Sequence, residues 1–407
     1  DAIIEQIKKI MHYMDVQYGI KNPVFLDFKE DREYMLKEIL PWMVRYAFTA
    51  PKISALNEPV VDFLKNFTQN QSLLDNITQH FFQETPAFFA LSYLKLYLEY
   101  YYPLGGTGKI IEKMVAFIKE HQGMILNNTR IESIYPDKKQ IVDDQGNSFR
   151  YRQLIWAADL TSFYKFIDID EVSSQSERAA FEKKKNTLSD KTGNDSVLTL
   201  YLAVDLPPEY FSNIASEHVF YTPRRTGESA AGPVPIGKGR KAIEIWLRDF
   251  FALTTYEISI PALRDSSLAP PGQTGLIISV LFDYSLTHHI REMGWYEDFK
   301  LLCENLFLEN LTGSIYPKLN DAIIHQFSAT PLTMEHYTAN RHGAITGWSF
   351  TNRPIPAESR LPKIFNASKT PFKDISKAGQ WTYSPSGLPI SILTGKLAAD
   401  RVIKALK

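Results

Sequence analysis

The sequence of 407 residues contains one cysteine, carries almost no net charge and has no long apolar run. Because Cys303 has no second cysteine to pair with, an intramolecular disulfide and a cysteine-rich metal site are excluded. The 45 Lys and Arg residues offset the 46 Asp and Glu residues, so the formal charge of -1 gives no overall field that would attract nucleic acid. No segment reaches the roughly 18 apolar residues that a membrane-spanning helix needs. We therefore expect a protein of a reducing compartment, the cytoplasm, that does not bind nucleic acid.

Motifs of nucleotide-binding, hydrolytic and metal-dependent enzymes are also missing. The glycine-rich stretch 105–110 lacks the first glycine of a phosphate-binding loop. The stretch 232–239 ends in glycine and contains two prolines, which cannot donate the amides that a phosphate needs. His288 and His289 are adjacent and would point to opposite faces of a strand, which suits a shared metal poorly. We expect no metal site, and no residue stands out as the catalytic acid or base.

The composition, with 44% hydrophobic and 13% aromatic residues, is sufficient for a large core in two or three domains. Residues 1–102 are predicted to be mostly helical, because apolar residues recur at spacings of three and four from Ile3 to Met14. The segment 88–102 is apolar and aromatic almost all round, which predicts a helix buried in the core. The alternative is a helix that lines an apolar substrate channel or lies in a membrane interface.

From residue 103 onward, strands and helices alternate. Residues 103–160 are predicted to form a compact α/β unit, residues 161–370 a β-rich region, and residues 371–407 a strand, a glycine turn and a helix. The predicted helices cover 109–121, 173–185 and 295–311, and the predicted strands cover 124–127, 129–134, 140–143, 148–151, 154–158, 196–204, 241–247 and 276–282.

The most informative segment runs from Ala378 to Pro389, between a short strand and the last helix. Glycines at the end of a strand let backbone amides approach an anionic group, and a proline in the first turn leaves the helix start intact. The exposed start of a helix carries about half a positive charge. From these residues alone, the segment fits either an anion-binding turn or an ordinary strand–turn–helix that closes an α/β domain.

This segment resembles the C-terminal flavin-binding signature of the phytoene desaturase-like flavoproteins, which include carotenoid desaturases, carotenoid isomerases and retinol saturase relatives. In that family an Ala-Gly-Gln-Trp stretch precedes Gly-Leu-Pro and a helix that ends in Gly-x-x-Ala-Ala. The matching residues here are 378–381, 387–389 and 395–399. Further blocks that resemble the family, in the expected order, are 102–134 with 157–159, 260–272, and 329–348. Together the blocks cover most of the chain from residue 100 onward.

The resemblance implies an α/β, FAD/NAD(P)-binding Rossmann-like flavoprotein fold with a mixed-sheet and helical substrate domain. Residues 1–102 would form the helical, membrane-facing part of that domain and residues 161–370 its sheet, while 103–160 and 371–407 would belong to the FAD domain. The family opens with Gly-x-Gly-x-x-Gly, which seats the FAD pyrophosphate and which occurs nowhere in these 407 residues. We therefore expect the chain to be N-terminally incomplete, which leaves its own FAD binding and activity open.

By resemblance, the protein is an FAD-dependent oxidoreductase that exchanges hydride between flavin and a polyisoprenoid, carotenoid-like or lipid substrate, in desaturation, saturation or isomerisation. FAD would be non-covalent, because Cys303 is not in a flavin-attachment pattern. The backbone of Ile131 would contact adenine, and the tip of the last helix would stabilise reduced flavin. The implied cofactor-binding residues are Ile131, Ala157, Gly379, Gln380, Trp381, Gly387, Leu388 and Pro389, and the candidate substrate residues are Tyr93, Tyr97, Tyr101, Trp348 and Phe350.

Two alternatives stay open. One is a flavin amine oxidase, which shares the flavin domain but would require an active-site aromatic pair and a lysine near the flavin. The other is a non-catalytic lipid-binding or interaction protein on a flavoprotein scaffold, which the missing Gly-x-Gly-x-x-Gly favours. The expected partners are a hydrophobic small molecule and, by peripheral contact, a membrane; the sequence gives no indication of oligomeric state.

Overall fold

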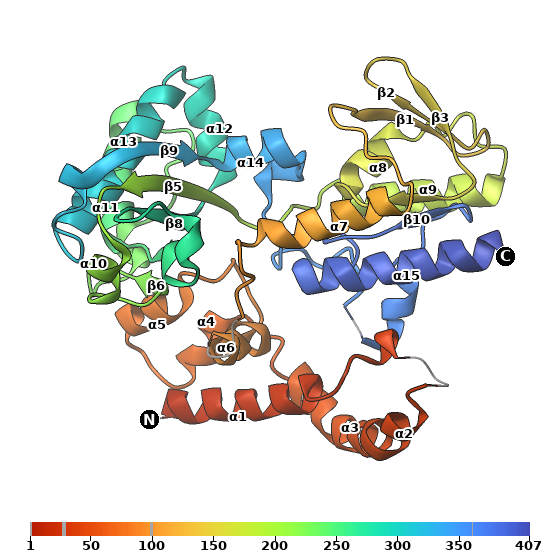
Figure 1. Cartoon of the computed structure of the whole chain (residues 1–407), viewed down its shortest axis with the longest axis horizontal. Helices are drawn as coiled ribbons and strands as arrows, with labels where there is room; N and C mark the ends of the chain where they lie inside the picture. The colour runs from red at the N-terminus through yellow and green to blue at the C-terminus, as the bar shows by residue number, and fades with distance from the viewer. Residues whose placement is uncertain (1, 27–29, 98–100, 360) are drawn as a thin grey trace.

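The computed structural model describes residues 2–26, 30–97, 101–359 and 361–407, which form three connected units (Figure 1). A helical unit contains the N-terminal part of the chain, and a five-stranded sheet with its helices contains the middle. An α/β unit combines the segment after residue 103 with the last helix. The N-terminal helices lie along the lower edge of the view, below the other two units. Among the described residues, no helix is long and apolar enough to cross a lipid bilayer.

The helical unit has a core of its own, which includes Ile10, Leu64, Leu74 and Leu91. The segment predicted as a buried helix forms α6, whose Phe88, Ala90 and Leu91 side chains are buried, so the core prediction is confirmed there; residues 98–100 lie outside the described residues. The elements are α1 (Ala2–Tyr18), α2 (Arg32–Tyr34), the π-helical turn η2 (Met35–Ile39), α3 (Leu40–Ser54), α4 (Val60–Lys65), α5 (Gln71–Thr78) and α6 (Ala87–Leu96).

The middle unit is built on a five-stranded sheet with strand order β6-β7-β8-β5-β9. Every neighbouring pair is antiparallel, so the expectation of a mixed sheet is corrected. The segment between β7 and β8 forms only two short 3-10 helices, η4 (Pro261–Leu263) and η5 (Ser266–Leu268), rather than the α-helix that usually carries the chain back for a parallel pair. The strands are β5 (Ser196–Val204), β6 (His218–Tyr221), β7 (Tyr256–Ser259), β8 (Thr274–Phe282) and β9 (Ile323–Ala329), and the helices are α10 (Pro208–Ser212), α11 (Arg240–Leu253), α12 (Tyr284–Glu292), α13 (Tyr296–Thr312) and α14 (Pro331–Thr338).

The two faces of this sheet differ in burial. Along β5 and β8 the even-numbered residues, such as Leu200 and Ile278, are buried in the largest core of the protein, together with α11 and α13. The odd-numbered residues, such as Tyr201 and Ile277, lie on the other face and are less buried, because successive side chains of a strand alternate between faces. We call this second face the open face of the sheet.

The α/β unit contains a parallel pair of short strands, β4 and β10, and a separate three-stranded antiparallel sheet. Its core includes Trp156, Phe163, Phe181 and Ile375. The strands are β1 (Ile131–Tyr135), β2 (Gln140–Asp143), β3 (Ser148–Arg150), β4 (Leu154–Trp156) and β10 (Ile375–Lys377), and the helices are α7 (Gly108–Glu120), α8 (Leu160–Phe166), α9 (Gln175–Leu188) and α15 (Leu388–Leu406).

Three of the predicted elements are wrong. Residues 241–247, predicted as a strand from their β-branched and aromatic content, belong to α11, where Ile243, Leu247 and Phe250 recur at helical spacing and are buried. Residues 124–127 form no strand. His288 and His289 lie on helix α12 rather than on a strand.

Candidate active site

The turn between β10 and α15 is shaped by a glycine that takes a left-handed conformation. Gly379 has φ 91°, and an added Cβ would lie 3.4 Å from the carbonyl oxygen of Ala157, at the end of β4. Its backbone N–H donates to Thr394 Oγ1 of α15 at 3.0 Å, which ties the turn to the helix. Ala157 and Ala158 are exposed, so small side chains leave the ends of both parallel strands accessible.

The N-terminal tip of α15 is not covered by a side chain. Gly387 is the residue before the helix, and no side chain caps the first turn. Leu388 and Pro389 are exposed, and the first amide of this turn with a helical partner is that of Ser391, which donates to the carbonyl of Gly387 at 2.9 Å. Amides and the helix dipole at this tip can therefore stabilise an anionic group.

A neighbouring segment, residues 347–350, packs against the turn before α15 and holds it in place by two hydrogen bonds. The N–H of Gly347 donates to Ser386 Oγ at 2.9 Å, and Trp348 Nε1 donates to the carbonyl of Trp381 at 3.0 Å. The two tryptophan rings meet edge-to-face at 4.8 Å between centroids, and both are buried. Trp381, predicted to bind the cofactor, and Trp348, predicted to line the substrate tunnel, thus lie in the support of the turn; their predicted roles stay predictions.

The residues at this turn fit one end of a flavin. The open amides of the α15 tip suit the negative charge of a reduced ring, and the left-handed Gly379 leaves room that a Cβ would fill. Thr382 Oγ1 is buried and has no hydrogen-bond partner among the described residues. No Gly-x-Gly-x-x-Gly turn is available in the 407 residues to seat a pyrophosphate. Ile131, predicted to contact adenine, begins strand β1 opposite Asp143 and is partly buried.

An aromatic path leads from the support of the turn to the edge of the five-stranded sheet. Phe350 contacts Phe89 at 5.9 Å between ring centroids, and Phe89 contacts Tyr93 at 5.0 Å. Tyr93 contacts Tyr97 at 5.9 Å, and Tyr97 contacts Phe220 of β6 at 5.2 Å. The structure thus brings three of the predicted substrate residues, Tyr93, Tyr97 and Phe350, into one continuous arrangement.

Tyr101, the remaining predicted substrate residue, lies apart from this path. It is 96% exposed and outside any helix or strand. A ring that is exposed to this extent contributes no enclosed apolar surface. Its role as a wall of the tunnel stays a prediction without support from the packing of the described residues.

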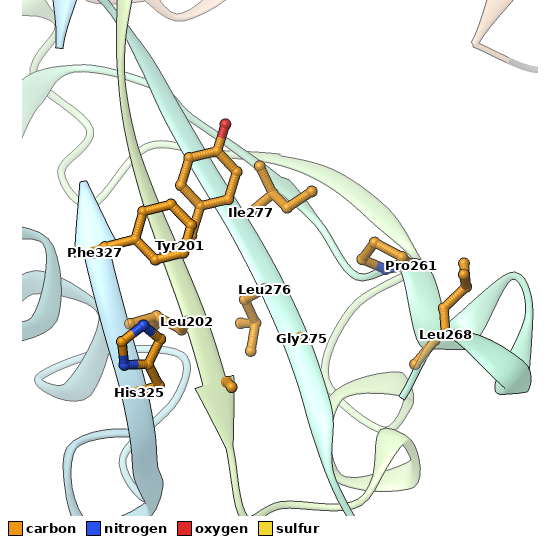
Figure 2. A pocket seen from close by; sticks show the side chains of 11 residues that line it. Tyr201, Leu202, Pro261, Leu268, Gly275, Leu276, Ile277, His325 and Phe327 are labelled. Atoms are coloured by element: carbon orange, nitrogen blue, oxygen red, sulfur yellow. The ribbon is translucent and has the colours of Figure 1, made fainter. Parts of the chain in front are cut away.

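The open face of the sheet holds an apolar pocket of about 250 Å³ that sequence reasoning missed (Figure 2). The rings of Tyr201 and Phe327 stack at 4.7 Å with an angle of 11° between their planes. Leu268 and Pro261 lie on the other side of the pocket in Figure 2. The alternation along β5 and β8 could have revealed these residues, because every second side chain of a strand that buries one face must lie on the other.

A polar row crosses the open face next to this pocket. Thr199 Oγ1 and Ser279 Oγ are 2.9 Å apart, and Glu257 is the cross-strand partner of Ser279. His218 Nε2 lies 3.0 Å from Glu257 Oε1. The row therefore places a carboxylate and an imidazole, two groups capable of proton transfer, on the same face as the aromatic pocket.

The start of β5 abuts the turn before α15. Asn194 N–H donates to the carbonyl of Gly347 at 2.8 Å, and Gly193 forms a β-bridge with Trp348. An extended strand advances about 3.4 Å per residue, so Thr199 lies about 10 Å and Tyr201 about 17 Å beyond Ser196. The open face thus extends outward from the candidate flavin end.

Two carboxyl groups at the junction of the helical and sheet units have raised pKa values. Burial raises the pKa of Glu228 to about 7, although Thr254 Oγ1 donates to Glu228 Oε2 at 2.7 Å. Burial also raises the pKa of Asp195 to about 6, although the N–H of Gln83 donates to it at 2.6 Å. Nearby Asp75 adds to the shift of Glu228, because like charges disfavour ionisation.

We expect Glu228→Gln to raise the free energy of unfolding by about 2 kcal/mol at pH 8 and to change it little near pH 4.5. Because the pKa of Glu228 is higher in the folded state, the stability that protonation contributes is complete below its ordinary value of 4.5 and is lost as the pH rises through about 7. Urea unfolding at both pH values measures the effect. The exposed Glu309→Gln is the control, and equal gains at both pH values would contradict the prediction.

Lys377 is buried directly before the turn between β10 and α15. Its ammonium group makes no hydrogen bond to any residue that the structure describes. Burial lowers its pKa to about 7, and the nearby Lys184 adds to the shift. Lys377 pairs with Trp156 in the β4–β10 register, whereas Ser376 faces α15, where Arg401 Nε contacts Ser376 Oγ at 3.4 Å. The Lys377 side chain therefore lies on the face away from α15 and its tip.

Comparisons with known proteins place this geometry in context, although no protein-family model matches the chain. The sequence is 23% identical over 312 residues to a phytoene desaturase (lycopene-forming) of Pseudescherichia vulneris, a match that covers 75% of this chain and 57% of the relative. It is 25% identical over 162 residues to a 4,4'-diapophytoene desaturase of Staphylococcus aureus (strain Newman), covering 37% of this chain and 29% of the relative. The chain thus spans little more than half the length of the first of these relatives.

Solved structures share the fold. An oxidoreductase from Methanosarcina mazei matches with a TM-score of 0.54 and 14% identity, covering 94% of this chain and 74% of that one. Putrescine oxidase bound to putrescine matches with a TM-score of 0.54 and 12% identity, covering 98% and 76%. Reduced UDP-galactopyranose mutase matches with a TM-score of 0.53 and 12% identity, covering 86% and 67%. At such identities the likeness shows the fold alone, which is the Rossmann-like flavoprotein fold expected from the sequence.

Proposed function

We propose that this chain, a phytoene desaturase-like FAD-dependent oxidoreductase, exchanges hydride between flavin and a long apolar polyene. The observation that carries the proposal is the open tip of α15 beside the left-handed Gly379, at the place where β5 begins. When bound, FAD would accept or donate the hydride. The residues of this chain would hold the flavin edge, orient the substrate and exclude water.

The open face supports an elongated apolar substrate. Its pocket is lined by aliphatic and aromatic side chains, and each methylene that it buries contributes about 0.8 kcal/mol. A polyene would lie along β5, with its reacting carbon near the α15 tip and its far end between Tyr201 and Leu268. Glu257 and His218 would supply or remove a proton where isomerisation requires one.

One observation favours a second candidate, a flavin amine oxidase. The carboxylate of Glu257 is exposed on the open face and could pair with a substrate ammonium. The third possibility, a lipid-binding protein without catalysis, is favoured by the missing Gly-x-Gly-x-x-Gly. Non-covalent FAD is supported by the position of Cys303, which is fully buried in the core of the sheet unit.

The proposal is tested on the protein expressed from its complete reading frame. We expect the purified protein to show the two visible absorption bands of flavin, which denaturation releases into the filtrate. Under anaerobic conditions, carotenoid-type polyenes should reduce the oxidised flavin or reoxidise the reduced flavin, whereas amines should leave it unchanged. A protein without flavin bands would favour the lipid-binding alternative, and bleaching by amines alone would establish the amine oxidase.

We expect Tyr201→Ser to raise the KM for a long polyene about tenfold while kcat changes little. The reason is that the substitution removes one wall of the pocket and the stack with Phe327, which lie away from the candidate flavin end. Steady-state kinetics with long and short polyenes measure the effect, which should be smaller for the short ones. Tyr337→Ser, at a ring that is 81% exposed on α14, is the matched control. An equal loss with both variants would contradict this use of the pocket.

A further inference from the structure

His80, in the turn after α5, has a buried imidazole that makes no hydrogen bond. Both of its ring nitrogens are buried, and neither has a hydrogen-bond partner among the residues that the structure describes. The preceding residue differs, because the side-chain amide of Gln79 donates to the carbonyl of Leu253 at 3.0 Å and accepts from the N–H of Glu228 at 2.9 Å. The chain around His80 is therefore held by ordinary polar contacts, and the unpaired imidazole belongs to this one side chain.

An imidazole that is buried and unpaired is unfavourable for folding. A neutral imidazole has one N–H that donates and one nitrogen that accepts. When both stay unpaired in the interior, the folded protein loses the hydrogen bonds that the ring made to water in the unfolded chain. Proteins retain such a loss mainly where a side chain serves a ligand rather than the fold. His80 therefore has the property of a ligand-binding residue.

The ring of His80 lies over the open face of the sheet, at its β6 edge. It contacts the ring of Phe220 at 4.6 Å and that of Phe81 at 4.0 Å between centroids. Phe220 is the cross-strand partner of Glu257, and paired residues of neighbouring strands have their side chains on the same face. Because Glu257 belongs to the polar row of the open face, the imidazole lies on the same side of the sheet as that row.

The aromatic path from the support of the turn ends at the same place. It begins at Phe350 and reaches Phe220 through the rings of α6 and of the residue that follows it. Phe89 and Tyr97 are about 12 Å apart along this helix, at 1.5 Å per residue. The path therefore offers an apolar wall from the candidate flavin end to His80. This course differs from the one along β5, which ends at the apolar pocket.

The surroundings of His80 favour a polar group without charge. Burial lowers the pKa of His80 to about 4, so the ring is neutral at pH 7 although the charge of Glu257 favours the cation. A substrate ammonium would meet the same burial, and a carboxylate would in addition be repelled by Glu257. A hydroxyl group is neutral and can donate to, or accept from, an imidazole nitrogen. The position therefore suits an alcohol.

We propose that His80 binds a hydroxyl group at one end of the polyene, so that the substrate is a polyisoprenoid alcohol rather than a hydrocarbon. This inference rests on the proposed function and assigns the second arm of its substrate. One arm follows β5 to the apolar pocket, and the other follows the aromatic path to His80. The hydrogen bond would prevent the chain from sliding along its apolar walls and would thereby decide which carbon lies near the α15 tip. His80 is a specificity-determining residue and takes no part in the hydride transfer.

Binding of three matched ligands to the protein from its complete reading frame tests this subsite. The probes are conjugated polyenes of about 20 carbons that end in a hydroxymethyl, a methyl or an aminomethyl group, and quenching of tryptophan fluorescence gives their Kd values. We expect His80→Phe to weaken binding of the alcohol about tenfold and to leave binding of the hydrocarbon unchanged. Comparing each ligand between parent and variant cancels the different solubilities of the ligands in water.

Two further variants separate hydrogen bonding from packing. His80→Gln keeps a donor and an acceptor and should retain most of the affinity for the alcohol. His12→Phe, at an exposed histidine of α1, is the matched control and should bind all three ligands as the parent does. Without ligand, His80→Phe should raise the Tm by a few degrees, because it removes two unpaired buried nitrogens.

Several results would overturn the subsite. They are a parent that binds none of the three ligands, unchanged alcohol binding in His80→Phe, an equal loss of alcohol and hydrocarbon, or a lower Tm of this variant, which would assign the ring to the fold. Tighter binding of the amine than of the alcohol, lost in His80→Phe, would identify an ammonium site instead.

The binding assay needs neither bound flavin nor turnover, so the subsite and the proposed function fail separately. Selection of the alcohol through His80 without polyene-dependent flavin chemistry overturns the proposed function alone. Flavin turnover that is equal on the alcohol and the hydrocarbon, in the parent and in His80→Phe, overturns the subsite alone.

Discussion

Replacement of Lys377 by methionine is expected to raise the free energy of unfolding by about 4 kcal/mol at pH 7. In the folded protein, burial lowers the pKa of this lysine from 10.5 to about 7, and the nearby Lys184 adds to the shift. Unfolding returns the side chain to water, where it is charged. Holding the lysine buried therefore costs stability, and an apolar side chain of similar length removes that cost.

The pH dependence of the difference has a definite sign. Since the folded pKa is the lower one, the cost is complete below about pH 7 and declines as the pH rises toward 10.5. The gain from Lys377→Met should therefore shrink between pH 7 and pH 10. Urea unfolding of both proteins across this range measures it, with the exposed Lys404→Met as a control that changes little. A loss of stability in the variant would show that Lys377 has a counter-charge or a water path.

The sequence was sufficient to predict the elements whose local pattern agrees with their tertiary role. Residues 196–204 were predicted as a strand and form β5, and residues 295–311 were predicted as a helix and form most of α13. The segment from Ala378 to Pro389 was predicted as a strand end, a glycine turn and a helix start. All three features are present, because Gly379 needs the left-handed region and Pro389 suits a first helical turn.

Other parts could not be predicted, because burial by distant elements decides them. Ile243 and Leu247 suit a strand by composition, yet they form α11 because their helical spacing buries them against the sheet. The pocket beside Tyr201 depends on β9 and on the loop that carries Leu268, both far away in the sequence. The helix predicted at 109–121 is present as α7, but none of its residues is buried in the part of the chain that the structure describes. Periodicity predicts a face and does not identify what covers it.

Gly347→Ala is expected to lower the free energy of unfolding by about 3 kcal/mol and to disorder the turn before α15. An added Cβ at this position would overlap the carbonyl oxygen of Gln380, which is a backbone atom and cannot rotate away. Gly347 also donates its N–H to Ser386 Oγ, so the strain would act on both sides of the turn. Because Trp348 and Trp381 pack edge-to-face next to it, near-ultraviolet circular dichroism should lose intensity in the tryptophan region.

A second glycine supplies the control for this prediction. Gly395 lies inside α15, and an added Cβ there would meet no atom within 4 Å. Gly395→Ala should therefore gain about 0.5–1 kcal/mol, since alanine loses less backbone freedom in a helix than glycine does. If the support of the turn shapes the flavin end, Gly347→Ala in the protein from the complete reading frame should also weaken FAD binding, whereas Gly395→Ala should not. Equal stability of the two variants would mean that the segment 347–350 can shift to accommodate the added Cβ. That result would remove the structural basis for a preformed flavin edge.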